Sequence, residues 1–237
     1  MDKNNINIFI LAGGFGTRLR SVVNDVPKPM APILNIPFLE YQIKEIRKYF
    51  PSSRIYLLTH YLSEIIEDYF RSDKSIIVLK EKKPLGTGGS IKNAINQLQL
   101  IESESILVFN GDTYIAPDLN SMVKNSKNKI SILGSLQNNC DRYGTLIIEN
   151  NFITNFNEKK VGINNSYINA GCYYFNNLEF FTKIKEEIFA IEDKFKEYLL
   201  NKKIDLFRYH DIFIDIGIPE DYDKMIKYIK DLNNGER

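Results

Sequence analysis

Short apolar runs alternate with helix-period segments through the first half of the chain. Four of the apolar runs have the length and continuity of strands that are buried on both faces. They are residues 6–12, 54–59, 75–80 and 105–110. The segments between them carry apolar side chains at helical spacing, and they are residues 38–50, 61–70 and 89–100. This alternation predicts an α/β fold with a doubly wound, mostly parallel mixed sheet that is flanked by helices.

The pattern changes in the second half of the chain. Strand-like segments follow one another there with few helices between them, which predicts a strand-rich extension of the sheet. They are residues 129–137, 144–150, 151–158 and 167–175. The pair Asn150 and Asn151 is typical of a tight turn between two of these strands. A helical stretch is expected over about residues 178–200, and a strand that enters a last helix over residues 213–232.

The composition suits one domain with a sizeable core. Of 237 residues, 43% are hydrophobic and 26% are charged, and no repeat or linker divides the chain. We therefore expect a single domain over residues 1–237. The 31 Lys and Arg residues nearly balance the 30 Asp and Glu residues, which leaves a formal charge of +1. This balance gives no overall basic field for nucleic acid or an anionic membrane, so any anion site is local.

The start of the chain and its cysteines indicate a compartment. The stretch MDKNNINIFILAGG holds an apolar run that is too short for a membrane span, and its acidic, Asn-rich start is unlike a secretory signal. We therefore expect a cytoplasmic protein. Cys140 and Cys172 are isolated and lack the spacing of a metal site, which in a reducing compartment predicts two thiols rather than a disulfide.

A glycine-rich loop follows the first predicted strand. Gly13, Gly14 and Gly16 allow the backbone to turn sharply and to approach a ligand closely. The carboxyl end of a strand in an open α/β sheet is where ligands bind. A dinucleotide fingerprint would need glycine or alanine where Leu19 stands, and a Walker loop would need glycine where Arg18 stands. The loop therefore matches neither of these signatures.

The residues after these glycines suit a polyphosphate. Thr17, Arg18 and Lys28 add a hydroxyl and two cations to the amide donors of the loop. A tight structural turn with solvated cations is the alternative, because glycine clusters often mark turns.

The motif L-A-G-G-F-G-T-R-L (Leu11 to Leu19), followed by K-P-M (Lys28 to Met30), resembles the signature of sugar-phosphate nucleotidyltransferases. The resemblance extends from Ile8 to about Tyr228 and implies a Rossmann-like nucleotidyltransferase fold. It implies a nucleotide-binding half at about 1–116 and a sugar-phosphate-binding half at about 117–237. It also implies that the loop binds a nucleoside triphosphate through Leu11, Ala12, Gly13, Gly14, Gly16 and Thr17, with Arg18 and Lys28 neutralising the phosphates.

A second glycine loop, PLGTGGSI at residues 84–91, follows a predicted strand and opens a helix. The resemblance assigns it to nucleotide binding, through Pro84, Gly86, Thr87 and Gly88. A helix cap is the alternative interpretation. Glu81 stands where thymidylyl and uridylyl relatives carry an amide. A carboxylate accepts hydrogen bonds only, and guanine offers adjacent N1 and N2 donors, so Glu81 favours guanine. An exposed surface charge is the alternative for Glu81.

Two aspartates follow predicted strands, Asp112 in FNGDTY and Asp215 in FIDIGIPEDY. Either residue alone would be interpreted as a turn or cap residue. Together they resemble the family's two magnesium ligands, although Ile218 stands where threonine is commoner. Carboxylate oxygens suit Mg²⁺, which completes its coordination shell with water and substrate phosphate. The resemblance therefore implies Mg²⁺ as the cofactor.

Three further segments resemble the family's sugar-phosphate site. In NEKK, Glu158 would bind sugar hydroxyls and Lys159 the sugar phosphate, although a charge run is usually a solvated turn. Two more pairs of residues would line the sugar pocket, and they are Tyr143 with Gly144 and Asn169 with Gly171.

The reaction implied by the resemblance needs no covalent nucleophile. An oxygen of the sugar 1-phosphate attacks the α-phosphorus of the triphosphate in line, and pyrophosphate leaves. Catalysis would then consist of positioning and charge neutralisation by Arg18, Lys28, Asp112 and Lys159.

Within the family, the chain looks most like the members that use GTP and D-glycero-α-D-manno-heptose 1-phosphate to make GDP-heptose for surface polysaccharide such as capsule. Transfer to mannose 1-phosphate stays open, as does a uridylyl or thymidylyl transferase on another sugar 1-phosphate, for which Glu81 would point to solvent. A regulatory subunit that senses nucleotides without turnover is the alternative outside enzymes. Many relatives are dimers or tetramers, so a homo-oligomer is compatible with the resemblance.

Overall fold

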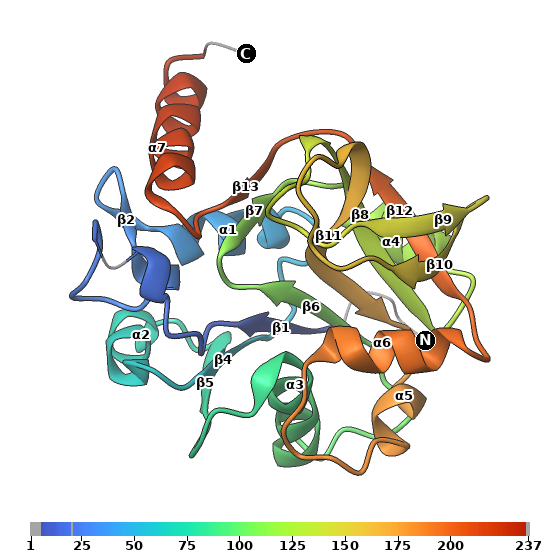
Figure 1. The fold of residues 1–237 in the computed structure, drawn as a ribbon. Coiled ribbons are helices and arrows are strands. Elements are labelled where there is room, and N and C mark those ends of the chain that lie inside the picture. Colours follow the sequence, from blue (N-terminus) through green and yellow to red (C-terminus); the bar gives the residue numbers. More distant parts are fainter. Residues whose placement is uncertain (1–5, 20, 236–237) are drawn as a thin grey trace.

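The computed structural model describes residues 6–19 and 21–235, which form a nine-stranded mixed sheet with helices on both faces (Figure 1). The strands lie in the order β5 (Ile76–Lys80), β4 (Ile55–Thr59), β1 (Asn7–Leu11), β6 (Ile106–Asn110), β11 (Asn164–Phe175), β8 (Ile130–Asn139), β12 (Ile204–Tyr209), β10 (Phe152–Phe156) and β9 (Leu146–Glu149). The first four are parallel to one another. The predicted α/β class and its strand-rich extension are confirmed.

The second half of the sheet is mainly antiparallel. Strand β11 runs antiparallel to both β6 and β8, and β10 runs antiparallel to β12 and β9, whereas β8 and β12 are parallel. The turn between β9 and β10 contains Asn150 with a positive φ of 57°, a conformation that asparagine tolerates better than most residues. This agrees with the turn predicted there.

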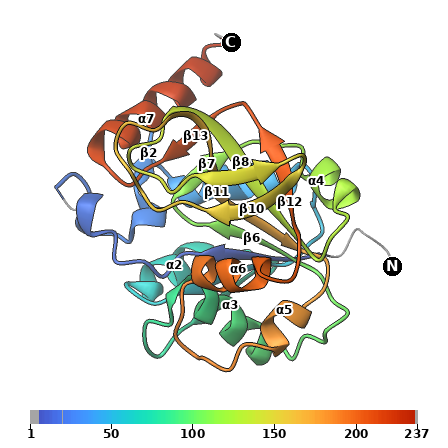
Figure 2. The ribbon, with the colours of Figure 1, turned by 45° about the vertical axis from the view of Figure 1, so that its right-hand side comes forward.

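Two layers of helices cover the sheet. One core cluster joins it to α1 (Phe38–Arg47), α2 (Ser63–Phe70) and α4 (Leu119–Asn125), and the other joins it to α3 (Gly86–Gln97), α5 (Glu179–Thr182) and α6 (Ile191–Leu199). Figure 2 shows α3, α5 and α6 grouped on one side of β1. Along β1, Ile8 and Ile10 belong to the first cluster and Phe9 to the second. Since side chains alternate between the faces of a strand, covering both faces requires a continuous apolar run.

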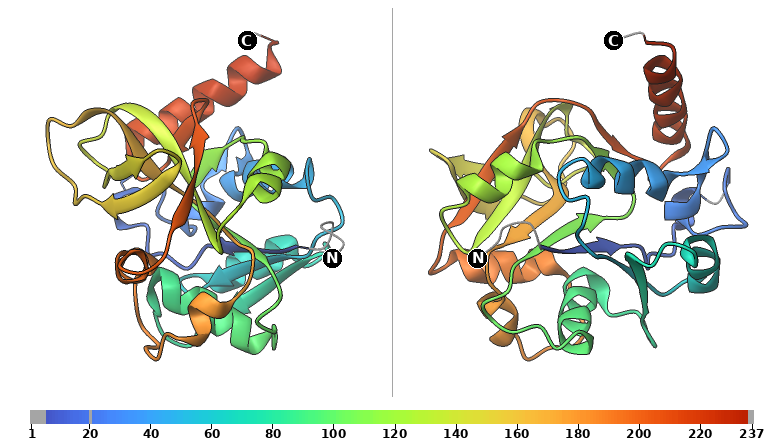
Figure 3. Two further views of the ribbon diagram at one scale, coloured as in Figure 1. Left: turned by 90° about the vertical axis from the view of Figure 1, so that its right-hand side faces the viewer. Right: turned by 180° about the vertical axis from the view of Figure 1, so that it is seen from behind.

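A third cluster lies at one end of the molecule. It packs α7 (Pro219–Asn233) against two small ladders, β7 (Thr113–Ile115) with β13 (Phe213–Asp215) and β2 (Pro32–Ile33) with β3 (Ile36–Pro37). Figure 3 shows that α7 projects from the body of the sheet. None of the helices within the described ranges combines the length and the apolar character that crossing a bilayer requires. Cys140 and Cys172 are buried free thiols, as expected.

The expectation of one helix over about 178–200 is wrong. The structure has the short α5 and then α6, with an irregular connection between them. In that connection Phe189 donates its N–H to the carbonyl of Leu85 (3.0 Å) and accepts from the N–H groups of Gly88 (3.1 Å) and Gly89 (3.2 Å). The N–H groups in the first turn of α3 have no acceptor within their own helix, and the carbonyl of Phe189 supplies one. If residues 178–200 formed one continuous helix, the backbone groups of Phe189 would be used inside that helix instead.

The strand order brings two loops together. From β1 the chain passes to β4 on one side, whereas β6 lies on the other side of β1, so the connections diverge at this point. The crevice at the carboxyl ends of such strands is the usual ligand site of an open α/β sheet. The backbone N–H of Gly111, directly after β6, donates to the carbonyl of Leu11 at the end of β1 (3.0 Å). The glycine loop and Asp112 are therefore neighbours.

Candidate active site

A cavity of about 330 Å³ opens at the carboxyl ends of β1 and β6. Seven residues that were predicted to bind the nucleotide line it, together with Asp112. They are Leu11, Gly13, Gly14, Glu81, Pro84, Gly86 and Thr87. Phe15, Leu85, Ser90 and Asn110 complete the wall. The two glycine loops, separated by about seventy positions in the sequence, therefore face one space.

Six of the residues predicted for the triphosphate or the second loop lie outside this wall, and they are Ala12, Gly16, Thr17, Arg18, Lys28 and Gly88. Ala12 is fully buried, and its N–H donates to the carbonyl of Leu58 (2.8 Å). Gly88 packs under the ring of Phe189, where an added Cβ would approach within 2.2 Å of a ring carbon. Gly16 turns with a positive φ beside Lys28, while Thr17 and Arg18 are exposed in the 3₁₀ turn Thr17–Leu19.

Glu81 is buried, with 5% of its surface exposed, and it lines the cavity. Its carboxylate accepts hydrogen bonds from the N–H of Leu85 (3.3 Å) and from the hydroxyl of Ser90. Burial raises the pKa of the Glu81 carboxyl. The interpretation as an exposed surface charge is therefore excluded. Glu81 thus binds the N–H of Leu85, the residue that directly precedes α3, and the hydroxyl of Ser90 within α3.

A second cavity of about 300 Å³ contains most of the predicted sugar-phosphate residues. Tyr143, Gly144, Glu158, Lys159 and Asn169 line it, and Asn110 lines both this cavity and the first one. The two spaces therefore meet at Asn110, the last residue of β6.

Gly171 lies behind the wall of the second cavity. Its N–H donates to the side-chain carbonyl of Asn169 (3.0 Å), and its φ of 68° falls in the region that favours glycine. An added Cβ would lie 2.4 Å from the amide nitrogen of Asn110. Because Gly171 has no side chain, Asn110 and Asn169 can both pack against it. Gly171 itself does not line the cavity.

Glu158 and Lys159 lie on the exposed rim of the second cavity. Glu158 forms an ion pair with Lys196 of α6, and this partner lowers the pKa of the carboxyl. Lys159 also lines this cavity, so the lining contains a second cation besides Lys196.

The two candidate metal ligands are held side by side by the β7–β13 ladder. Asp215 pairs with Thr113 in that ladder, and the N–H of Ile216 donates to the backbone carbonyl of Asp112 (3.0 Å). Burial and the nearby charge of Asp112 raise the pKa of Asp215. Two repelling carboxylates in a partly buried site are a donor set that fits a hard divalent cation.

Cations surround this pair of carboxylates. The ammonium of Lys28 lies 2.6 Å from a carboxylate oxygen of Asp112. The guanidinium of Arg142 lies 3.5 Å from Asp215 and also pairs with Asp221 at the start of α7. Within residues 6–19 and 21–235, no group of three or more His, Cys, Asp or Glu side chains could hold a metal.

Several residues of the site escaped the sequence interpretation. Asn110, Tyr173, Glu192 and Lys196 line the second cavity, and Arg142 pairs with Asp215. Asn110 directly precedes the Gly-Asp pair and Arg142 directly precedes Tyr143, so the motifs pointed to their neighbourhood. Glu192 and Lys196 come from α6, which enters the site only through tertiary packing against α3.

Comparisons with known proteins find relatives that match most of the chain. Residues 8–231 match the family described as nucleotidyl transferase. The chain is 38% identical to the D-glycero-alpha-D-manno-heptose 1-phosphate guanylyltransferase of Campylobacter jejuni over 216 residues, covering 90% of this chain and 95% of that protein. The enzyme of the same name from Aneurinibacillus thermoaerophilus is also 38% identical, over 93% of this chain and 97% of its own.

A solved structure extends the similarity to three dimensions. HddC from Yersinia pseudotuberculosis, complexed with GMP-PN, superposes with a TM-score of 0.82 at 33% identity. The match covers 94% of this chain and 99% of that chain.

Proposed function

Because this chain belongs to the nucleotidyl transferase family, we propose that it transfers the GMP group of GTP to D-glycero-α-D-manno-heptose 1-phosphate. The products are GDP-heptose and pyrophosphate. The single observation that carries the proposal is the junction of two cavities at Asn110, with Lys28, Asp112 and Asp215 gathered beside it. The names of the 38% identical relatives support the choice of sugar and base.

The first cavity suits GTP. The backbone of Gly13 and Gly14 leaves room for the phosphates, and the buried Glu81 offers an acceptor-only group to a base. Guanine presents two adjacent donors, N1–H and N2–H, whereas uracil and thymine place an acceptor beside their single donor. The carboxylate therefore favours guanine over these pyrimidines.

The second cavity suits the sugar 1-phosphate. Glu158 and Asn169 supply acceptors and donors for hydroxyl groups, and Lys159 supplies a cation for the phosphate. Since Asn110 borders both spaces, a phosphate oxygen bound beside Lys159 would face the α-phosphorus of a nucleotide in the first cavity. The gain from such positioning is large, because it replaces a bimolecular encounter by a preformed arrangement.

Charge neutralisation provides the rest of the catalysis. Lys28 would move from Asp112 to the triphosphate, and Arg18 would add a second cation from the exposed turn. We propose that Asp112 and Asp215 hold Mg²⁺, which when bound would neutralise the phosphate charge that develops during transfer. Arg142 fixes Asp215 and Asp221 in place. The substrates are metabolites of the cytoplasm, so we propose that the protein works there and supplies surface polysaccharide synthesis such as capsule formation.

The experiment that tests the proposal measures pyrophosphate release with Mg²⁺ across a grid of substrates. GTP, UTP, dTTP, CTP and ATP are each combined with heptose, mannose and glucose 1-phosphates. The expected result is fastest turnover with GTP and the heptose phosphate. Faster turnover with mannose 1-phosphate would overturn the choice of sugar, and turnover with UTP or dTTP would overturn the assignment of Glu81.

The variant Asp112→Asn separates an enzyme from a nucleotide sensor. In an enzyme it should abolish turnover while most of the GTP affinity survives, because the base and the loop contacts remain. An unaltered biological effect of the Asp112→Asn protein in cells, without turnover, would favour the sensor.

A further inference from the structure

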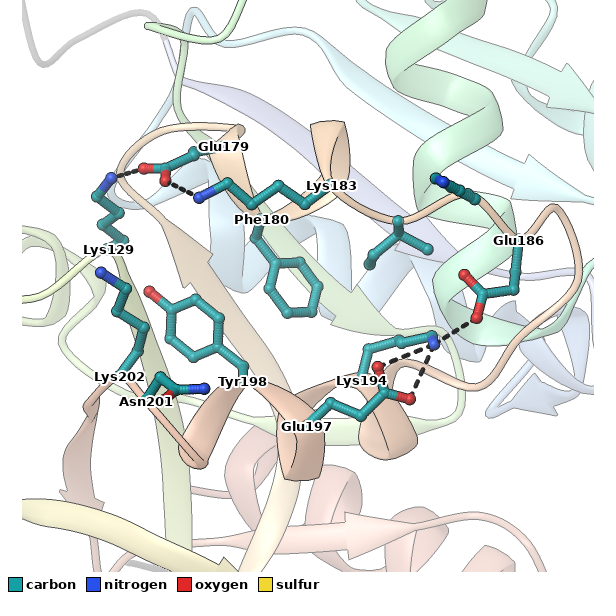
Figure 4. A pocket seen from close by; sticks show the side chains of 12 residues that line it. Lys129, Glu179, Phe180, Lys183, Glu186, Lys194, Glu197, Tyr198, Asn201 and Lys202 are labelled. Atoms are coloured by element: carbon teal, nitrogen blue, oxygen red, sulfur yellow. Dashed lines mark hydrogen bonds and ion pairs between the residues drawn. The ribbon is translucent and has the colours of Figure 1, made fainter.

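A third cavity, of about 470 Å³, lies between α5 and α6 (Figure 4). It has no lining residue in common with the two cavities of the candidate active site. Phe180, Ile184 and Tyr198 form its apolar wall. The rings of Phe180 and Tyr198 meet edge to face, with centroids 5.5 Å apart. Five lysines surround this wall, and they are Lys129, Lys183, Lys185, Lys194 and Lys202.

The charges around the cavity are unbalanced. Three glutamates line it: Glu179 pairs with both Lys129 and Lys183, and Glu186 and Glu197 both pair with Lys194. Lys185 and Lys202 form no ion pair with any other described residue, so this local surface has an excess of positive charge although the whole chain carries only +1. Figure 4 shows the hydroxyl of Tyr198 on the side of the cavity where Lys129 and Lys202 also lie.

We propose that this cavity binds a nucleoside phosphate at a site distinct from the active site. The phosphate would lie between Lys129, Lys202 and the hydroxyl of Tyr198, where cations and a donor converge. The base would cover the exposed part of the Tyr198 ring, a contact open to any aromatic heterocycle. Asn201 and Glu197 on the rim can bond polar edges of a base, which an acyl chain would leave unpaired. The volume falls within the range of small-molecule sites.

The cavity is connected to the nucleotide loop of the active site. Lys92 of α3 donates to the carbonyls of Ile184 (2.5 Å) and Glu186 (3.1 Å) in the segment that forms one wall. The same segment continues to Phe189, whose carbonyl accepts from the N–H groups of Gly88 and Gly89. A ligand that orders this segment therefore also orders the first turn of α3, which makes the cavity a regulatory site for GTP binding.

The test is calorimetric titration with GDP, which fits the active site and the proposed site. The wild-type protein is expected to bind two equivalents. The double variant Lys129→Gln/Lys202→Gln should lose the second binding event, or weaken it by about tenfold, because two exposed charge contacts disappear. The variant Lys227→Gln/Lys230→Gln removes the same charge from exposed positions on α7 and is the matched control. Lys28→Met weakens the active site and should leave the second event in place.

Two results would overturn the proposal. One is equal stoichiometry and affinity in the Lys129→Gln/Lys202→Gln protein and its α7 control. The other is pyrophosphate binding to the cavity as tightly as GDP, because the base would then contribute nothing.

The connection to α3 is tested by hydrogen exchange of residues 84–90 in the Lys28→Met background. GDP should slow this exchange, and adding Lys129→Gln and Lys202→Gln should abolish the effect. Unchanged exchange on GDP binding to the cavity would refute the regulatory role.

Discussion

Thr87 and Glu192 are 105 positions apart in the sequence and are joined by a hydrogen bond of 3.2 Å from the hydroxyl to the carboxylate. The other carboxylate oxygen of Glu192 accepts from the hydroxyl of Tyr173 (3.3 Å), which in turn accepts from the amide of Asn169 (3.0 Å). A continuous chain of hydrogen bonds therefore runs from the second glycine loop to the second cavity, and α6 carries its central member.

The variant Glu192→Gln tests this connection. A glutamine amide is neutral and retains one acceptor oxygen, so one of the two hydroxyl groups loses its acceptor, and losing a hydrogen bond to a charged group typically costs about 1.5–3 kcal/mol. We expect kcat/KM to fall by about tenfold or more, with KM raised for both substrates, as measured by steady-state kinetics. The exposed neighbour Asp193→Asn is the control. If Glu192→Gln raised KM for only one substrate, the two half-sites would not be coupled through this chain.

Lys28 lies 2.6 Å from Asp112 and should contribute to nucleotide binding and, more strongly, to the transition state. By analogy with the removal of one oxyanion-hole donor, Lys28→Met should reduce kcat by about 10² to 10³. Single-turnover kinetics at saturating GTP would measure this loss. A fall in GTP affinity that accounts for the whole effect would instead make Lys28 a ground-state binding residue.

Glu81 should control the choice of base. In Glu81→Gln, one of two acceptor oxygens becomes a donor, which complements the donor and acceptor edge of uracil or thymine. We expect the ratio of kcat/KM for GTP to that for UTP to fall by at least tenfold. Ser90→Ala removes a partner of Glu81 without changing the carboxylate, and it should largely preserve the ratio. An unchanged ratio in Glu81→Gln would show that other groups recognise the base.

The raised pKa of Glu81 gives a pH dependence with a definite sign. Guanine donors require the ionised carboxylate, so KM for GTP should rise as the pH falls through the pKa of Glu81, which burial shifts above that of an ordinary glutamate. The rise of KM at acid pH should therefore begin at a higher pH than it would if the group were an exposed glutamate. In Glu81→Gln this rise of KM at acid pH should disappear, and its persistence would assign the titration to another group.

Gly88 should be needed for packing. An added Cβ would come within 2.2 Å of the buried Phe189 ring, so Gly88→Ala should reduce the free energy of unfolding by about 1–3 kcal/mol. Urea denaturation would measure the loss. Gly14→Ala is the matched control, because a Cβ there meets nothing within 4 Å and the effect should be confined to GTP binding. Equal stability of the two variants would contradict this role of Gly88.

The periodicity of the chain and its local motifs predicted much of this protein. The continuous apolar runs of β1, β4, β5 and β6 indicated strands covered on both faces, because only a two-faced burial needs apolar residues at successive positions. The glycine spacing located the two loops that line the first cavity, since backbone turns and close approaches depend on neighbouring residues. These are local properties, and a single sequence records them directly.

Tertiary packing decided the remainder. The break between α5 and α6 exists because Phe189 satisfies the first turn of α3, a segment about a hundred positions earlier. Glu192 enters the site because α6 packs against α3, and no local pattern in the sequence indicates this position. The burial of Glu81 was equally undetermined, because in the sequence it stands in an ordinary charged run, and only the folding of α3 over its carboxylate removes it from solvent. Contacts between distant segments depend on the whole fold, which no short motif contains.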